Sequence, residues 1–116
     1  MSEKLVIIES PFAGEIEKNI AYARACMHDS LSRGEYPYAC HLLYTQEGIL
    51  NDEIPADREL GIRAGLAWGK FAQKTVVYTD LGISDGMKLG IERAKDEGRP
   101  VEYRKLENWE ENNEGK

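Results

Sequence analysis

The sequence predicts an α/β fold, a three-layer αβα sandwich around a four-stranded, mostly parallel sheet. Two short runs of β-branched residues, 5–8 and 75–78, have the composition of strands buried on both faces. Segments with apolar residues at helical spacing follow these runs, and strands that alternate with such helices form right-handed βαβ units. At 116 residues the chain has the size of a single domain.

The first half of the chain contains a strand, a helix and a second strand. Residues 5–8 form an apolar run that ends before Ser10 and Pro11. Apolar residues at steps of three and four then predict a helix that Gly34 ends. One face of this helix is formed by Ile16, Ile20, Ala23, Met27 and Leu31. The second strand is expected at residues 36–39, where Pro37 favours an edge position because proline cannot donate to the ladder.

The second half of the chain repeats this alternation twice. A helical face follows the loop around Pro55, and it consists of Leu60, Ala64, Ala67 and Phe71. Residues 75–78 form the third strand, and the next helix turns Met87, Ile91 and Ala94 inward. A fourth strand is expected at residues 100–103. In the tail that follows, Trp109 is expected to dock on the body of the domain or on a neighbouring subunit.

Four strands connected in this way predict the order 2-1-3-4, which is the flavodoxin-like arrangement. In such a sheet the strand order reverses between the first and third strands, and ligands bind at the carboxyl ends of the strands there. The loops at this point are residues 9–14 and 79–87. We therefore expect any ligand site to involve these two loops.

Composition narrows the classes of partner. The chain has 15 basic and 21 acidic side chains, a net charge of -6, which disfavours long nucleic acid as a partner. No apolar run approaches the roughly 18 residues of a membrane helix, so a cytoplasmic protein without membrane contact is expected. Cys26 and Cys40 form no CxxC pair and only two histidines occur. We expect reduced thiols, no metal site and no cofactor.

Two groups of residues lie in the loops where a ligand is expected. Ser84, Asp85, Gly86 and Met87 begin a helix, where free N–H groups favour an anionic or hydroxyl-rich ligand, although Ser84 is also an ordinary helix cap. Asp80 precedes them and is a candidate for a ligand hydroxyl contact.

The other group follows the first strand. Ser10 offers a hydroxyl, Pro11 fixes the exit of the chain, and Phe12 offers a ring that can cover a planar ligand. The alternative is a rigid turn with a partly buried Phe12. His41 follows the second strand and either reaches the rim of the same site or has a structural role.

These motifs, in this order, resemble the nucleoside 2-deoxyribosyltransferase-like family, particularly its short relatives from phages and prophages. The resemblance rests on Ser10-Pro11-Phe12, His41-Leu42-Leu43, Asp57-Arg58-Glu59-Leu60-Gly61, Gly82-Ile83-Ser84-Asp85-Gly86-Met87 and Gly98-Arg99-Pro100-Val101. It covers residues 4 to about 103, so we expect a family-like domain at residues 1–105 and an acidic tail at 106–116. It implies a flavodoxin-like fold, a homo-oligomer and a pocket for a nucleoside or nucleotide.

The resemblance also implies a catalytic pattern from which this chain departs. In active transferases a glutamate four residues beyond the motif glycine attacks the anomeric carbon of the deoxyribose, as in retaining glycosidases. That position is Gly90 in this sequence, and the tyrosine that positions the nucleophile corresponds to Ile7. The acid two residues before the motif glycine corresponds to Ser84. Standard transferase chemistry is therefore in doubt.

Glu9 is the residue that complicates this conclusion. It ends the first strand, where relatives carry a small residue, and it faces the helix that contains Gly90 if the fold is correct. We hypothesise that the Glu9 carboxyl group occupies the space left by Gly90 and is a speculative catalytic group. The alternatives are that Glu9 points outward or only contacts a ligand hydroxyl.

The leading interpretation is a nucleoside- or nucleotide-binding protein in which N-glycosidic cleavage or transfer is either retained through Glu9 or lost. Whether the protein is an enzyme stays open at this stage. The alternative is a non-catalytic, phage-type accessory protein that sequesters a nucleotide or binds a host protein. Base release or exchange in the presence of deoxynucleosides separates the two.

Overall fold

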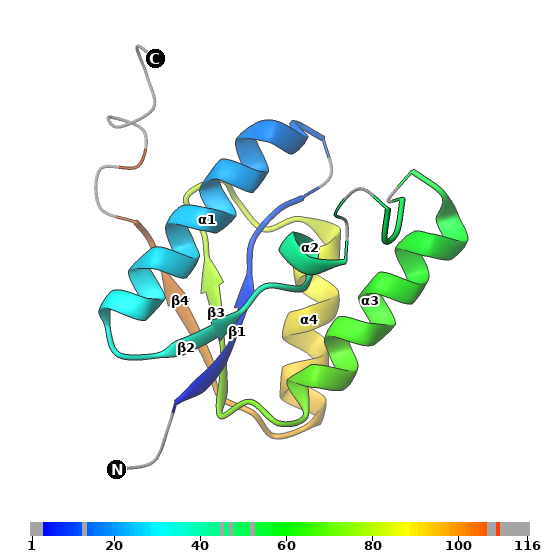
Figure 1. Cartoon of the computed structure of the whole chain (residues 1–116). Coiled ribbons are helices and arrows are strands. Elements are labelled where there is room, and N and C mark those ends of the chain that lie inside the picture. Colours follow the sequence, from blue (N-terminus) through cyan, green and yellow to red (C-terminus); the bar gives the residue numbers. More distant parts are fainter. Residues whose placement is uncertain are drawn as a thin grey trace.

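The structure of the chain is a computed structural model. It describes residues 4–12, 14–44, 46, 48–51, 53–106 and 109, without the side chains of residues 40 and 41. Figure 1 shows strands and helices alternating along the chain. The elements are β1 (Leu5–Glu9), α1 (Ile16–Ser32), β2 (Tyr36–Tyr38), α2 (Cys40–Leu43), α3 (Pro55–Gly69), β3 (Lys74–Tyr78), α4 (Asp85–Asp96) and β4 (Val101–Arg104).

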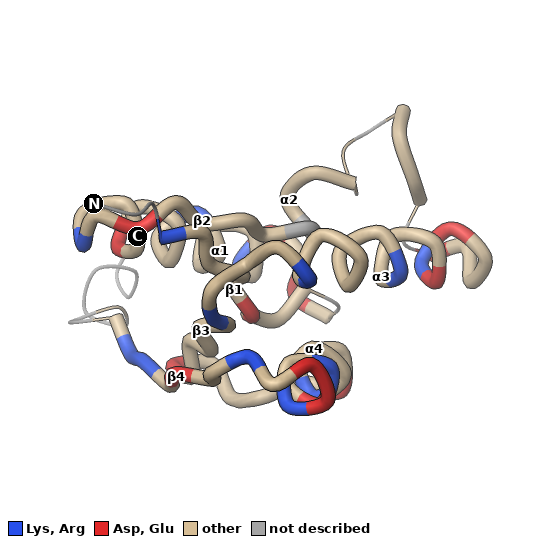
Figure 2. Tube along the Cα trace, turned by 90° about the horizontal axis from the view of Figure 1, so that it is seen from below, with Lys and Arg blue, Asp and Glu red and all other residues tan. Residues whose placement is uncertain are grey.

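The four strands form one sheet in the order β2-β1-β3-β4, and every neighbouring pair is parallel. The predicted fold class and strand order are confirmed, and the sheet is entirely parallel rather than mostly so. Helix α1 covers one face, while α3 and α4 lie on the other (Figures 1 and 2). The arrangement is flavodoxin-like, and the carboxyl ends of β1 and β3 lie side by side, with Glu9 in register with Val77.

The core consists of two layers because side chains alternate between the faces of each strand. Val6, Ile8, Val76 and Tyr78 pack with the inward residues of α1 in the larger layer. On the opposite face, the smaller layer joins Val77 to the α4 residues Met87 and Ile91. The inward face predicted for this helix, Met87, Ile91 and Ala94, is confirmed, since all three are buried.

Helix α1 has the predicted extent but buries a different face. Its buried residues are Asn19, Tyr22, Ala23, Cys26 and Ser30. Of the predicted face only Ala23 is buried, and Leu31 is 53% exposed. The helix turns polar side chains inward because they have partners there: the Tyr22 hydroxyl donates to Asp80, and Ser30 donates to Glu35. Apolar spacing alone cannot reveal such pairs.

Helix α3 departs further from its predicted face. Leu60 is 47% exposed, and Phe71 lies beyond the helix end and is 72% exposed. The buried residues of α3 are instead Gly65 and Gly69. A Cβ atom on Gly69 would lie 3.1 Å from the Arg99 guanidinium, so the absence of a side chain allows the close approach. The helix therefore packs through its smallest residues.

The remaining differences are local. The short helix α2 was not predicted, because four residues do not complete the period that reveals a helix in a sequence. Trp109 is 8% exposed and meets Tyr22 edge-to-face at 5.0 Å, so it docks on the body of the domain. The rest of the predicted tail, apart from residue 106, lies outside the described residues. Within the described part of the chain, none of the helices has the length and hydropathy needed to cross a membrane.

Candidate functional site

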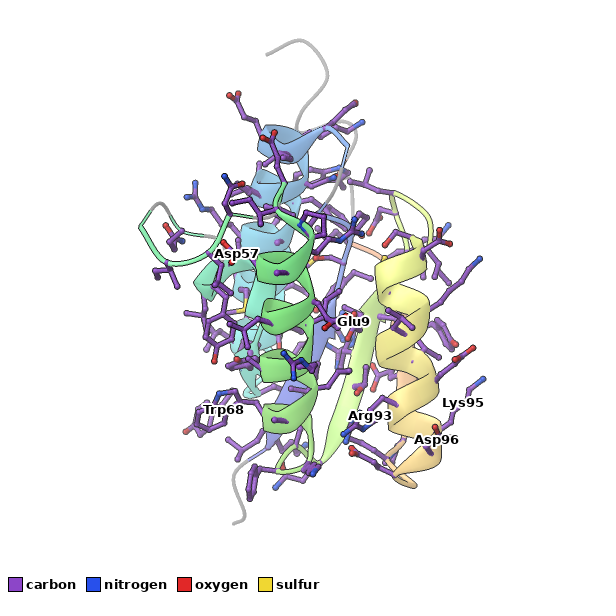
Figure 3. All side chains as sticks on the ribbon, turned by 90° about the vertical axis from the view of Figure 1, so that its right-hand side faces the viewer. Glu9, Asp57, Trp68, Arg93, Lys95 and Asp96 are labelled. Carbon is purple, nitrogen blue, oxygen red and sulfur yellow. The ribbon has the colours of Figure 1, made fainter. Side chains whose placement is uncertain are left out.

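The candidate site lies where β1 ends between α3 and α4. Alternation along β1 turns Val6 and Ile8 toward α1, so that Ile7 and Glu9 lie on the opposite face. We call the cavity at this place the Glu9 pocket; its volume is about 60 Å³, and it contains the Glu9 side chain between α3 and α4 (Figure 3). Its walls include four glycines, namely Gly65, Gly69, Gly86 and Gly90.

The Glu9 carboxyl group occupies the space beside Gly90. A Cβ atom on Gly90 would overlap this carboxyl group and would lie within 2.9 Å of its Oε1 atom. Any other residue at position 90 would therefore force Glu9 to move. The juxtaposition that the sequence predicted is present, and the alternative that Glu9 points outward is wrong.

Burial governs the charge of Glu9. Among the described residues no hydrogen bond or ion pair to its carboxyl group is present, and the side chain is partly buried. Burial raises the pKa of Glu9 from 4.5 to about 8, and the positive charge of Arg99 offsets part of this rise. At pH 7 most of the carboxyl group is therefore protonated, and a neutral carboxyl can both donate and accept a hydrogen bond.

Arg99 also lines the Glu9 pocket, and sequence analysis gave it no role. It is 9% exposed, and its guanidinium donates to the Thr75 hydroxyl at 3.0 Å, the Gly69 carbonyl at 2.7 Å and the Glu97 carboxylate at 2.6 Å. Its charge is thus engaged with the protein itself. Nothing in the sequence around Arg99 distinguishes it from a surface arginine, because its partners come from distant segments.

Three of the predicted ligand-binding residues, Pro11, Asp80 and Ser84, line a separate, open hollow beside the start of α1. The Ser84 hydroxyl accepts a hydrogen bond from the Met87 N–H at 3.3 Å, so the interpretation of Ser84 as a helix cap is confirmed. Asp80 accepts from the Tyr22 hydroxyl at 2.5 Å and from the Leu106 N–H at 2.9 Å. These contacts tie α1 and the end of β4 to the loop after β3.

The other predicted ligand-binding residues at the start of α4 lie in three different environments. Asp85 is exposed and lies 3.8 Å from Lys88, whereas Met87 is 1% exposed and packs against Val77. Gly86 lines the Glu9 pocket. The structure therefore gives Met87 a packing role, and ligand contact by Asp85 and Gly86 stays a prediction.

The turn after β1 is well anchored. Ser10 and Pro11 are buried, Phe12 is partly buried, and the Phe12 carbonyl accepts a hydrogen bond from the Asn19 side chain at 2.9 Å. His41 falls in α2 rather than in a loop, and its side chain lies outside the described residues. In the described part of the chain, His, Cys, Asp and Glu form no cluster of three that could hold a metal ion.

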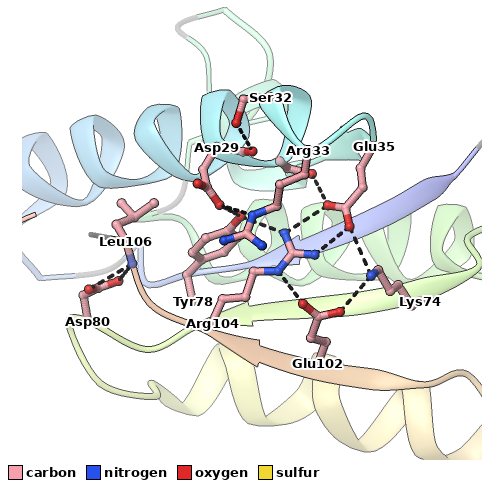
Figure 4. Close-up of polar contacts among 11 residues, drawn as sticks. Asp29, Ser32, Arg33, Glu35, Lys74, Tyr78, Asp80, Glu102, Arg104 and Leu106 are labelled. Atoms are coloured by element: carbon pink, nitrogen blue, oxygen red, sulfur yellow. Dashed lines mark hydrogen bonds and ion pairs between the residues drawn. The ribbon is translucent and has the colours of Figure 1, made fainter. Parts of the chain in front are cut away.

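The opposite face of the sheet carries a buried ionic network that was not predicted from the sequence (Figure 4). We call it the Glu35 network. Arg104 donates to both oxygens of Glu35, at 3.0 and 2.6 Å, while Ser30 and Lys74 contact the same carboxylate at 2.7 and 3.1 Å. Glu102 pairs with both cations. The residues of the network come from four separate segments, so no local sequence pattern predicts that they meet.

Fold and pocket together define the class of protein: a small flavodoxin-like α/β domain with a carboxyl group in a glycine-walled pocket at the switch point of its sheet. Residues 4–104 match the sequence model of a family described as a domain of unknown function (DUF7768), so the chain belongs to that family. None of the curated proteins compared with the chain matches it. The resemblance to nucleoside 2-deoxyribosyltransferases stays a prediction.

Proposed function

We propose that this protein binds a nucleoside or nucleotide at the Glu9 pocket. The observation that carries the proposal is the carboxyl group of Glu9 in the space beside Gly90. In the transferases that the sequence resembles, the helix position equivalent to Gly90 carries the glutamate that meets the nucleoside. A carboxyl group supplied by β1 instead of α4 would meet the ligand from a neighbouring direction.

The protonation of Glu9 favours binding over standard transferase chemistry. A carboxyl group attacks a carbon atom only when it is ionised, and the pKa of about 8 keeps most of Glu9 neutral at pH 7. A neutral carboxyl group is suited to hydrogen bonding and to donating a proton. Binding is therefore the first candidate function.

N-glycosidic cleavage or transfer is the second candidate, and the same juxtaposition of Glu9 and Gly90 favours it. In this reaction the ionised fraction of Glu9 attacks C1' of the sugar, forming an oxygen–carbon bond as the carbon–nitrogen bond to the base breaks. The departing base takes the electron pair of that bond and a proton from the solvent. Water or a second base then attacks C1', the bond between C1' and Glu9 breaks with its electron pair returning to the carboxylate, and the attacking group loses its proton to the solvent.

One experiment distinguishes these functions. The purified protein is incubated with each of the four deoxynucleosides and a free base, products are separated by chromatography, and binding is measured by calorimetry. Binding without base release supports the first candidate; base release or exchange that Glu9→Gln abolishes supports the second. Asp96→Asn, which alters an exposed carboxylate at the far end of α4, is the matched control and should change neither. Saturable binding to none of the deoxynucleosides or their 5'-phosphates contradicts the proposal.

The same measurements distinguish two cellular roles, and a separate measurement tests self-association. A phage-type accessory protein that sequesters a nucleotide would show binding without turnover, whereas one that binds a host protein would show neither. Self-association, which the resemblance implies, stays a prediction that analytical ultracentrifugation tests.

A further inference from the structure

We propose that two copies of this chain associate through the outer side of α3, with their two α3 helices antiparallel about a two-fold axis. The surface is a row of residues on the side of α3 that points away from the sheet, and we call it the α3 face. It consists of Leu60, Ala64, Ala67 and Phe71, with Trp68 at its edge. The inference does not depend on the proposed function, because it concerns a different surface.

The large apolar side chains of the α3 face are exposed to solvent. Leu60, Trp68 and Phe71 are 47%, 54% and 72% exposed. Figure 3 shows this side of the molecule, with Trp68 beside the last turn of α3. The row from Leu60 to Phe71 advances in steps of four, three and four residues, which is the spacing of a helix that packs against another helix. In a single copy of the chain this row packs against nothing.

The inner side of α3 is occupied by small residues. Gly65 and Gly69 lie about half a turn round the helix from the α3 face, are buried and form part of the wall of the Glu9 pocket. The larger residues on that side, Ile62 and Leu66, are partly buried and line the same pocket. The helix therefore contacts its own domain largely through backbone and presents its largest side chains to another molecule.

The α3 face is complementary to itself when the two helices run in opposite directions. A two-fold axis that passes between Ala64 and Ala67 would set Phe71 of one copy over the partner's Leu60, and the same contact would repeat at the other end. The two alanines at the centre would let the helix backbones approach closely. Large side chains at the ends and small ones in the middle thus fit a second copy of the same surface.

Charged residues beside the row favour the antiparallel direction. Glu59 and Lys70 lie on the same flank of the α3 face, and both are exposed. Within the part of the chain that the structure describes, neither forms an ion pair. An antiparallel pair would place Glu59 beside the partner's Lys70 twice, whereas a parallel pair would place each charge beside its own copy. The charges therefore select one direction of pairing.

The exposed area is of the size that an interface needs. An aromatic side chain covers 150–250 Å², so Trp68 and Phe71 together present roughly 200–300 Å² to solvent. A specific interface buries about 800 Å² on each partner, and Leu60 with the aliphatic stems of Glu59 and Lys70 adds to this area. An apolar patch of a few hundred Å² on a soluble domain is typical of an interaction surface.

The first test is sedimentation velocity over a range of protein concentrations. We expect the wild type to be mostly dimeric at about 100 μM. Leu60→Ser should weaken the dimer at least about tenfold, because it removes an apolar contact at both ends of the pair. Leu31→Ser is the matched control, since Leu31 is an exposed leucine on α1, across the sheet, and it should change nothing. Thermal melting confirms that each variant is folded.

A charge exchange tests the direction of the helices. Glu59→Lys should weaken the dimer at least about threefold, because it creates two contacts between like charges. The double substitution Glu59→Lys with Lys70→Glu should restore the affinity to within about twofold of the wild type. Glu17→Lys makes the same change of charge at an exposed glutamate of α1 and should leave the affinity unchanged.

Three results would overturn the inference. The first is a wild type that stays monomeric at about 200 μM. The second is a dimer that Leu60→Ser and Leu31→Ser weaken equally, since the interface would then lie elsewhere. The third is a double substitution that binds no more tightly than Glu59→Lys alone, because the helices would then not be antiparallel. No nucleoside is present in these measurements, so their failure is distinct from failure of the proposed function.

Discussion

Two glutamates on opposite faces of one sheet show how differently a fold can treat a buried carboxyl group. Glu35 is 4% exposed, and burial alone would raise its pKa, but hydrogen bonds from Arg104, Ser30 and Lys74 lower it to about 2. Glu9 is partly buried, the structure provides no hydrogen-bond partner for its carboxyl group among the described residues, and its pKa rises to about 8. The partners, more than the burial, decide the direction.

The two environments suit the two glutamates to different roles. A carboxylate whose hydrogen bonds are all made within the protein stabilises and orders the fold, as the Glu35 network does. A partly buried carboxyl group that makes no hydrogen bond within the protein, as at Glu9, destabilises the fold when it ionises and stays available to another molecule. This is the physical reason for placing function at Glu9 and structure at Glu35.

The largest effect is expected from breaking the Glu35 network. Arg104→Met keeps an apolar side chain in place but leaves the Glu35 charge buried with only Lys74 and Ser30. We expect a loss of about 3–5 kcal/mol in the free energy of unfolding, measured by urea denaturation at pH 7. Lys88→Ala, which removes an exposed ion pair with Asp85, should change it by less than about 1 kcal/mol. Equal effects of the two substitutions would contradict the assignment.

Lowering the pH should reduce the stability of the wild-type protein through the same network. Because the pKa of Glu35 is about 2 in the folded protein and 4.5 in the unfolded chain, its contribution is complete above pH 4.5 and is lost as the pH falls toward 2. The shift of about 2.5 pKa units corresponds to a loss of about 3 kcal/mol. Denaturation at a series of pH values measures it. Glu35→Gln should flatten this part of the profile, and an unchanged slope would count against the network.

The contribution of Glu9 to stability should depend on pH in the opposite direction. Its pKa is raised in the folded protein, so its ionisation reduces stability progressively between pH 4.5 and about 8. Glu9→Gln removes this penalty. The rise of about 3.5 pKa units corresponds to at most about 4 kcal/mol at pH 8, and because solvent screens the partly exposed side chain we expect the variant to be more stable than the wild type by roughly 2–3 kcal/mol. At pH 4.5 the difference should be small. Melting curves at both pH values check it, and a variant that is destabilised equally at both would contradict the assignment.

The smallest effect concerns the space shared by Glu9 and Gly90. Gly90→Ala favours the helix by up to about 1 kcal/mol, but its Cβ atom displaces the Glu9 carboxyl group. We expect little net change in stability in the wild type, together with a gain of up to about 1 kcal/mol when Glu9 is replaced by alanine. Gly86→Ala is the control, because a Cβ atom there meets nothing within 4 Å. Identical effects of Gly90→Ala with and without Glu9 would contradict the shared volume.

Much of the fold could be predicted from the local pattern of apolar residues in the sequence. The β-branched runs and the inward face of α4 depend on near neighbours in the sequence, and connection rules then supply the strand order. The buried faces of α1 and α3 were not predictable in the same way. Tyr22 and Ser30 turn inward because of partners 58 and 5 residues away, and α3 packs through glycines, which carry no hydrophobic signal.

The candidate site could be predicted only where it depends on strand order and on the spacing of residues along a helix. Glu9 and Gly90 could be placed together because both follow from strand order and helix register. The role of Arg99 depends on Gly69, 30 residues away, and on Thr75, 24 residues away. Such contacts are created by the packing of whole elements, so the walls of the pocket emerge only once α3 and α4 are set against the sheet.

The most direct test of the central claim is an amide chemical-shift titration of the ¹⁵N-labelled protein with the four deoxynucleosides at pH 6.5. We expect saturable shifts concentrated at Glu9, at Gly65 and Gly69 of α3, and at Gly86 and Gly90 of α4. Saturable shifts confined to α1 and the Glu35 network, or no saturable shift with any deoxynucleoside, would contradict it.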